Sequence, residues 1–131
     1  MTRIRIETLL VPGPAGTIEV LADLPAAPRG VALVCHPHPL FGGANTNKVT
    51  YTLARAYAEL GYAALRPNFR GVGQSAGRHD HGEGETDDML ALLAWAGERW
   101  GEGELALAGF SFGAYVPVSY THLTLPTTPY V

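Results

Sequence analysis

Apolar residues alternate with polar ones over residues 4–11 and again from Thr17 to Leu24. The connecting residues 12–16, Pro-Gly-Pro-Ala-Gly, are of the kinds that break strands and form turns. Alternation with a period of two is typical of strands, and a short connection favours antiparallel pairing. This part of the chain therefore predicts two antiparallel strands joined by a turn.

Three later segments are continuously apolar rather than alternating. They are Val31–Cys35, Tyr62–Leu65 and Leu105–Ala108. A short, unbroken apolar run is typical of a strand that is covered on both faces, as the strands of parallel sheets are. These segments therefore predict the central strands of a mostly parallel sheet.

Helical spacing separates these strands. From about Asn47 the apolar residues fall on one helical stripe, and Gly61 stands where a C′ glycine would end the helix. The stripe consists of Val49, Leu53, Ala54, Tyr57 and Leu60. A second helix is predicted near Glu85–Trp100, because acidic residues in its first turn suit the helix dipole.

The order β-β-β-α-β-α-β predicts an α/β fold. Right-handed crossovers between parallel strands place helices on both faces of a mostly parallel sheet. Residues 1–116 are expected to form this domain and to include the start of a third helix. Residues 117–131 are rich in threonine, uncharged and without periodicity. We expect them to be an unstructured and non-native tail, since the string is similar to translated sequencing-adapter read-through.

Composition narrows the class of protein. A chain of 131 residues suits one domain, and 47% hydrophobic with 16% charged residues is typical of soluble globular proteins. The net charge of -3 and the scattered Lys and Arg disfavour nucleic acid or a membrane surface and favour a small-molecule partner. No run approaches the ~20 apolar residues of a membrane span. The single cysteine, Cys35, and the lack of a signal-peptide pattern predict a cytoplasmic location.

A candidate nucleophile directly follows the last predicted strand. Residues 109–113 have the sequence Gly-Phe-Ser-Phe-Gly, which matches the G-x-S-x-G elbow in its strand-turn-helix setting. In such a turn Ser111 stands in a strained conformation, and Gly109 and Gly113 let strand and helix approach closely. The Phe112 N–H is then free to donate to an oxyanion. The motif predicts Ser111 as the nucleophile of a hydrolase.

A second oxyanion donor is expected from residues 36–43, which follow the first of the apolar strands. The prolines in this loop have no N–H, so the donor must come from His38, Leu40 or the residues after it, with Leu40 the first candidate and Phe41 the second. His36 and His38 could instead suggest a metal site. Neither a carboxylate nor a cysteine lies at ligand spacing, however, so we predict no metal and no other cofactor.

Four motifs stand in order along the chain: C-H-P-H-P-L-F-G-G at 35–43, N-K-V at 47–49, L-R-P-N-F-R-G-V-G-Q-S-A-G at 65–77 and G-F-S-F-G at 109–113. Over roughly residues 4–116 the chain thereby resembles bacterial α/β-hydrolases described only as predicted hydrolases, which are related in outline to dienelactone hydrolase and small esterases. The resemblance implies the N-terminal part of an α/β-hydrolase fold with Ser111 as nucleophile. It also implies that 36–43 is the oxyanion side and that Arg70, Gly71 and Ser75 form a structural loop beside the pocket.

Two alternatives to a hydrolase remain. Residues 71–77 contain G-x-G-x-x-x-G after a strand, which would suit a dinucleotide-binding domain. The helix of a dinucleotide-binding unit normally follows the glycines at once, whereas residues 79–82 delay it here. The other alternative is a non-catalytic binding module built on the same fold.

The sequence after the nucleophile lacks the other members of a triad. On this fold the acid and the histidine follow the serine along the chain. No Asp or Glu follows Ser111, and His122 lies in the atypical tail. Asp80, Asp87 and Asp88 precede the serine and are interpreted as loop contacts or helix-start charges. We therefore expect a truncated, inactive fragment of a serine hydrolase that acts on esters, thioesters or similar acyl compounds.

Overall fold

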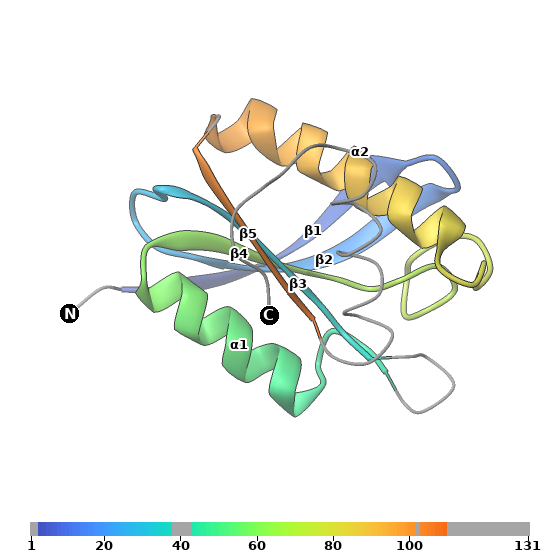
Figure 1. Cartoon of the computed structure of the whole chain (residues 1–131), viewed down its shortest axis with the longest axis horizontal. Coiled ribbons are helices and arrows are strands. Elements are labelled where there is room, and N and C mark those ends of the chain that lie inside the picture. Colours follow the sequence, from blue (N-terminus) through green and yellow to red (C-terminus); the bar gives the residue numbers. More distant parts are fainter. Residues whose placement is uncertain (1–2, 38–42, 102, 110–131) are drawn as a thin grey trace.

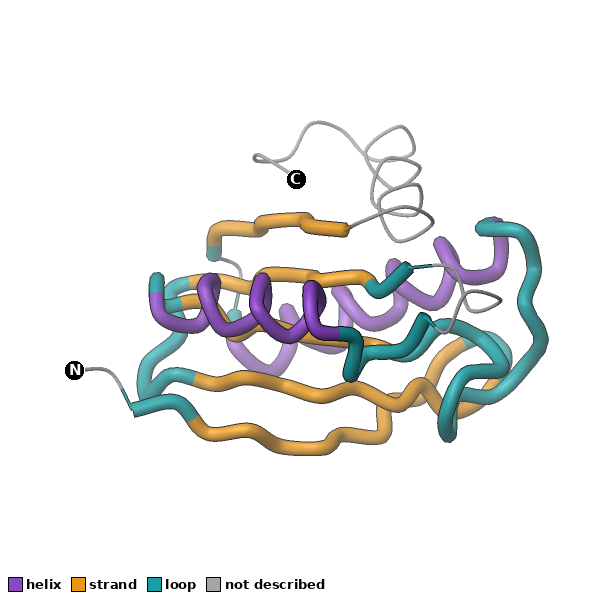
Figure 2. The backbone as a smooth tube through the Cα atoms, turned by 90° about the horizontal axis from the view of Figure 1, so that it is seen from below, coloured by secondary structure: helices purple, strands orange, loops and turns teal. Residues whose placement is uncertain are grey.

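Residues 3–37, 43–101 and 103–109 are described by the computed structural model of the chain. They form one sheet of five strands in the order β1-β2-β4-β3-β5, with α1 and α2 on its two faces (Figure 1). Figure 2, turned by 90° and seen from below, shows one helix in front of the strands and the other behind them. The elements are β1 (Arg5–Gly13), β2 (Gly16–Leu24), β3 (Gly30–Cys35), α1 (Lys48–Glu59), β4 (Tyr62–Pro67), α2 (Glu83–Trp100) and β5 (Glu104–Gly109).

The order and type of these elements confirm the sequence prediction. The sheet is mixed, because β2 runs antiparallel to both β1 and β4, while β3 is parallel to β4 and β5. The three continuously apolar segments are the three parallel strands, as predicted. The helix expected near Glu85 begins two residues earlier, at Glu83. No helix in the described part of the chain is both long and apolar enough to cross a membrane.

Side chains of β3 alternate between two unequal cores. Leu33 and Cys35 of β3 join a large cluster with Met89 and Leu92 of α2. On the other face, the buried side chains are small, and most of them are alanines. They are Ala32, Val34, Ala54, Ala58, Ala64, Ala106 and Ala108. Small side chains allow α1 to lie close to the sheet, so most of the apolar volume lies under α2.

Each end of α1 is fixed by a residue that suits the position. The Asn47 side chain accepts hydrogen bonds from the N–H groups of Val49 and Thr50, at 2.9 and 3.2 Å. These bonds satisfy donors that a helix start leaves without partners. After Leu60, Gly61 has a φ of 100°, a conformation that favours glycine. The predicted glycine stop is therefore confirmed.

A buried ion pair joins β4 to β2. The Arg66 guanidinium donates from Nε and Nη2 to the two carboxylate oxygens of Asp23, at 2.8 and 3.3 Å. The two side chains are only 4% and 0% exposed. A charge taken out of water is tolerated only when a partner and hydrogen bonds replace its hydration. The pair therefore fixes β4 against β2 near the carboxyl end of β4.

Replacing one member of this pair should destabilise the fold strongly. Asp23→Ala leaves the Arg66 charge buried without its carboxylate, which should cost ~3–5 kcal/mol of unfolding free energy. The matched control is Glu59→Ala, which removes the exposed pair of Arg55 and Glu59 on α1 and should cost less than about 0.5 kcal/mol. Urea unfolding of both variants measures the difference. Equal, small losses would contradict the role given to the buried pair.

Candidate active site

The strands β3 and β5 end side by side at the carboxyl edge of the sheet (Figure 1). Their register pairs Cys35 with Gly109, each the last residue of its strand. Gly109 is also the first residue of the Gly-Phe-Ser-Phe-Gly motif. The two chain segments with the expected catalytic groups therefore leave the sheet from neighbouring strands. Ser111, Phe112, Gly113, Leu40 and Phe41 themselves lie outside the described residues, as do 117–131, and their roles stay predictions.

His36 is completely buried directly after β3. Its Nε2 accepts a hydrogen bond from the Phe69 N–H at 3.0 Å, and its Nδ1 lies 2.6 Å from the Pro37 carbonyl oxygen. Because Nε2 is an acceptor, the proton of the neutral ring is on Nδ1, from which it is donated to Pro37. The ring also packs on that of Phe69, with 4.4 Å between centroids. His36 thus joins the end of β3 to the residues that follow β4.

Burial decides the charge of this histidine. It lowers the pKa of His36 to about 4, against the smaller, opposite effect of the bond to Pro37. The ring is therefore neutral near pH 7, and both its nitrogens are engaged within the protein. The sequence raised His36 as a possible metal ligand. Among the described residues no cluster of three or more His, Cys, Asp or Glu side chains could hold a metal ion.

Asn45 holds the far end of the loop that begins at His36. Its backbone N–H donates to Asn68 Oδ1 at 2.8 Å, and its side-chain amide donates to the Arg66 carbonyl at 3.0 Å. Its carbonyl accepts from Arg66 Nη1 at 3.1 Å. We call residues 66–69 the anchor segment, because both described ends of the loop are bonded to it.

The anchor segment is itself held from β2 and from residues 70–82 before α2, which we call the glycine-rich loop. Asn68 Nδ2 donates to Glu19 Oε1 at 2.8 Å, and the same oxygen accepts from the Gln74 N–H at 2.9 Å. Ser75 Oγ donates to the Asn68 carbonyl at 2.7 Å and accepts from the Glu19 N–H at 2.9 Å. Gly73 has a φ of 56°, and a Cβ there would overlap the Glu19 and Asn68 side chains. This tight packing supports the structural role that the resemblance implies for Ser75.

The glycine-rich loop uses its donors within the protein. The N–H of Gly71 donates to the Ser75 carbonyl at 3.2 Å, and that of Ala76 to Thr17 of β2 at 2.8 Å. Phosphate-binding loops instead point their N–H groups at the ligand. These contacts argue against the dinucleotide-binding alternative.

Two acids before Ser111 make contacts of the kind expected from the sequence. Asp88 accepts from Arg70 Nε and Nη2 at 2.8 and 3.0 Å, and Asp80 accepts from the Gly84 N–H at 3.0 Å. Burial raises the pKa of Asp88, and Arg70 opposes that effect. These carboxylates hold the start of α2 against the glycine-rich loop.

Sequence reasoning missed the polar network around the anchor segment. The roles of Glu19, Asp23, Asn45, Arg66 and Asn68 were not predicted. A signal was present, since Asp23 and Arg66 interrupt apolar strands. Charged residues in such strands need partners when they are buried.

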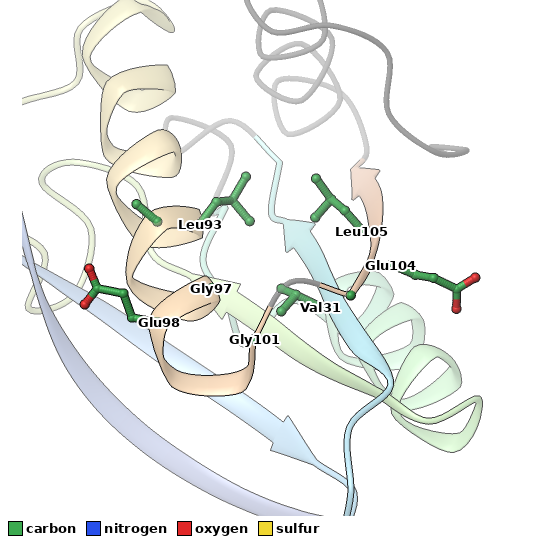
Figure 3. Close-up of a pocket in the computed structure, with 9 residues that line it drawn as sticks. Val31, Leu93, Gly97, Glu98, Gly101, Glu104 and Leu105 are labelled. Carbon is green, nitrogen blue, oxygen red and sulfur yellow. The ribbon is translucent and has the colours of Figure 1, made fainter.

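A concavity of about 410 Å³ lies at the opposite, amino end of the parallel strands. Figure 3 shows that Val31 of β3, Leu93 of α2 and Leu105 of β5 line it, while the Glu98 and Glu104 carboxylates point outward. Ligands of parallel α/β sheets bind outside the carboxyl ends of the strands. This concavity is therefore separate from the candidate active site.

Comparison with known proteins supports the resemblance to α/β-hydrolases that the sequence motifs indicated. A family model described as X-Pro dipeptidyl-peptidase (S15 family) matches residues 18–127. An uncharacterized protein of Rickettsia prowazekii is 45% identical over 108 residues, which are 79% of this chain and 44% of that protein.

Two solved structures are similar over nearly the whole chain. An α/β serine hydrolase homologue from Coxiella burnetii is 45% identical, with a TM-score of 0.85 over 91% of this chain and 58% of that one. An α/β serine hydrolase without a lid from Xanthomonas campestris is 44% identical, with a TM-score of 0.86 over 93% and 58%. The chain thus spans less than two thirds of the length of these relatives.

The family match covers most of the chain, and the mixed sheet agrees with the N-terminal part of α/β serine hydrolases. The chain therefore belongs to the X-Pro dipeptidyl-peptidase (S15) family within the α/β-hydrolase superfamily.

Proposed function

We propose that this chain is the nucleophile-bearing part of a serine hydrolase that cleaves an ester, thioester or similar acyl bond. The Ser111 hydroxyl attacks the acyl carbonyl and gives its proton to a histidine base, which passes it to the leaving group. Water then cleaves the acyl-enzyme and restores the serine. The N–H groups of Leu40 and Phe112 hold the oxyanion that forms in each step.

One observation carries this proposal, the pairing of Cys35 with Gly109. Since β3 and β5 are parallel neighbours, they end at the same edge of the sheet, where residues 36–43, which we call the oxyanion loop, and the elbow at 109–113 begin. A nucleophile and an oxyanion donor must lie within about 3 Å of one reacting group. Adjacent strands that end in register are the arrangement that this chemistry needs.

We propose that the triad acid and histidine stand in the part of the complete protein that corresponds to the unmatched length of the similar serine hydrolases. The sequence after Ser111 has no acid, and the chain covers 58% of each of the two similar serine hydrolases. In this fold both partners follow the nucleophile along the chain. We propose a cytoplasmic location for the complete protein, because a single cysteine, Cys35, provides no internal disulfide framework in this part.

The family name adds a second kind of acyl compound to the test. The matching model is described as X-Pro dipeptidyl-peptidase, and peptides and esters are cleaved through the same acyl-enzyme chemistry. A p-nitrophenyl ester and an Xaa-Pro p-nitroanilide therefore report on the two substrate classes in parallel. We expect turnover of the ester.

The complete protein should react with a fluorophosphonate probe at Ser111. The activated hydroxyl attacks the phosphorus, so a tryptic peptide with residues 109–113 should gain the mass of the adduct. Ser111→Ala should abolish both labelling and ester turnover. Ser75 serves as an internal control, because its hydroxyl is buried and bonded to Asn68. If the complete protein folds and Ser111 is not labelled, the result would favour the non-catalytic binding module instead.

The 131-residue chain alone should show no Ser111-dependent hydrolysis. Without a positioned base the serine is a very weak nucleophile, and oxyanion donors alone leave at most ~10³–10⁴-fold over water. The rate of the purified chain with a short p-nitrophenyl ester should match that of its Ser111→Ala variant. A clear Ser111-dependent rate from a monomer would show that His122 or Asp80 acts as the base.

A further inference from the structure

We infer that His36 is a positioning residue of the proposed hydrolase: through its hydrogen bond to Phe69 it holds the start of the oxyanion loop on the anchor segment. The inference rests on the proposed function, since it concerns the placement of the Leu40 N–H. His36 does not touch the reacting atoms in this proposal. Its contribution is to fix the chain on which the donor stands.

The geometry of the two loop ends is the first support. His36 Nε2 accepts from the Phe69 N–H at 3.0 Å at one end. At the other end the Asn45 N–H donates to Asn68 Oδ1 at 2.8 Å. The acceptor at one end and the donor at the other are bonded to consecutive residues of one segment. The two described ends of the loop that includes Leu40 are therefore held by the same segment.

The rigidity of the anchor segment is the second support. Hydrogen bonds reach it from β2 through the buried Asp23 and the half-buried Glu19, and from the glycine-rich loop through the buried Ser75. A hydrogen bond positions a loop only as well as its other end is fixed. Here that other end belongs to a network of buried polar groups that satisfy one another.

The chemistry of the side chain is the third support. A neutral imidazole accepts at one nitrogen and donates at the other, which lets His36 bond Phe69 and the Pro37 carbonyl at the same time. Alanine provides neither group. Glutamine is uncharged and has both an acceptor and a donor, so it can restore the bond to Phe69.

This placement should affect the rate of the chemical step rather than the binding of substrate. An oxyanion donor acts mainly on the charge that develops in the transition state. A misplacement of about 1 Å can cost ~10²-fold in rate. Loss of the His36 bond should thus lower kcat and leave KM nearly unchanged.

The test compares three variants of the complete protein in ester turnover. His36→Ala should lower kcat by about 10- to 100-fold with KM changed by less than about twofold, and His36→Gln should recover most of kcat. Ala54→Gly is the matched control, because it weakens the buried face of α1 on the other side of the sheet and should leave kcat unchanged. A His36→Ala variant with unchanged kcat, or with a loss that appears in KM, would overturn the inference.

Amide hydrogen exchange separates failure of this inference from failure of the proposed function. In the complete protein the Phe69 and Asn45 amides should be protected, and His36→Ala should accelerate exchange at Phe69 by at least about tenfold. Unchanged protection at Phe69 would overturn the inference whatever the activity. Absence of any Ser111-dependent turnover would contradict the proposed function, and with it the effect of His36 on kcat, even where the Phe69 bond is present.

Discussion

The buried pairing of Arg66 with Asp23 is the interaction on which the carboxyl edge of this sheet depends. A guanidinium in the interior loses its hydration, and the carboxylate offsets part of that cost through two hydrogen bonds. The remaining donor, Nη1, then reaches the Asn45 carbonyl. One buried cation thereby joins β2, β4 and the loop after β3, and the other contacts of the edge build on this arrangement.

From this pairing a series of hydrogen bonds leads to the candidate active site. Asn68 lies two residues after Arg66, is held by Glu19, and in turn accepts from Asn45. Phe69 follows and donates to His36. Stability and the proposed chemistry thus share the same few residues.

The histidine illustrates how environment decides the role of a residue type. A histidine beside a proposed hydrolase site suggests a base or a ligand when only the sequence is considered. Burial lowers the pKa of His36 to about 4, and its two nitrogens bond Phe69 and Pro37. A ring that is neutral and engaged on both sides suits positioning rather than proton transfer.

The sequence predicted the elements and their order well, because periodicity and glycine positions depend on local chemistry. The apolar runs at 31–35 and 105–108 and the stop at Gly61 required no knowledge of distant residues. The polar network could not be predicted in the same way. Glu19 and Asn68 are 49 positions apart, and nothing local marks them as partners. Asp23 and Arg66 offered a partial signal as charges within apolar strands, which predicts burial with a partner but not which partner.

The central claim is that the series of hydrogen bonds ending in the one from the Phe69 N–H to His36 holds the residues after β3 in place. The protonation state of His36 tests it most directly, because the bond to Phe69 requires an Nε2 without a proton. Long-range proton–nitrogen correlation spectra of histidine-labelled protein report the state of each ring nitrogen. At about pH 5.5, below the ordinary pKa of histidine, His36 should be neutral with its proton on Nδ1. A protonated ring at that pH, or a neutral ring with the proton on Nε2, would contradict the account.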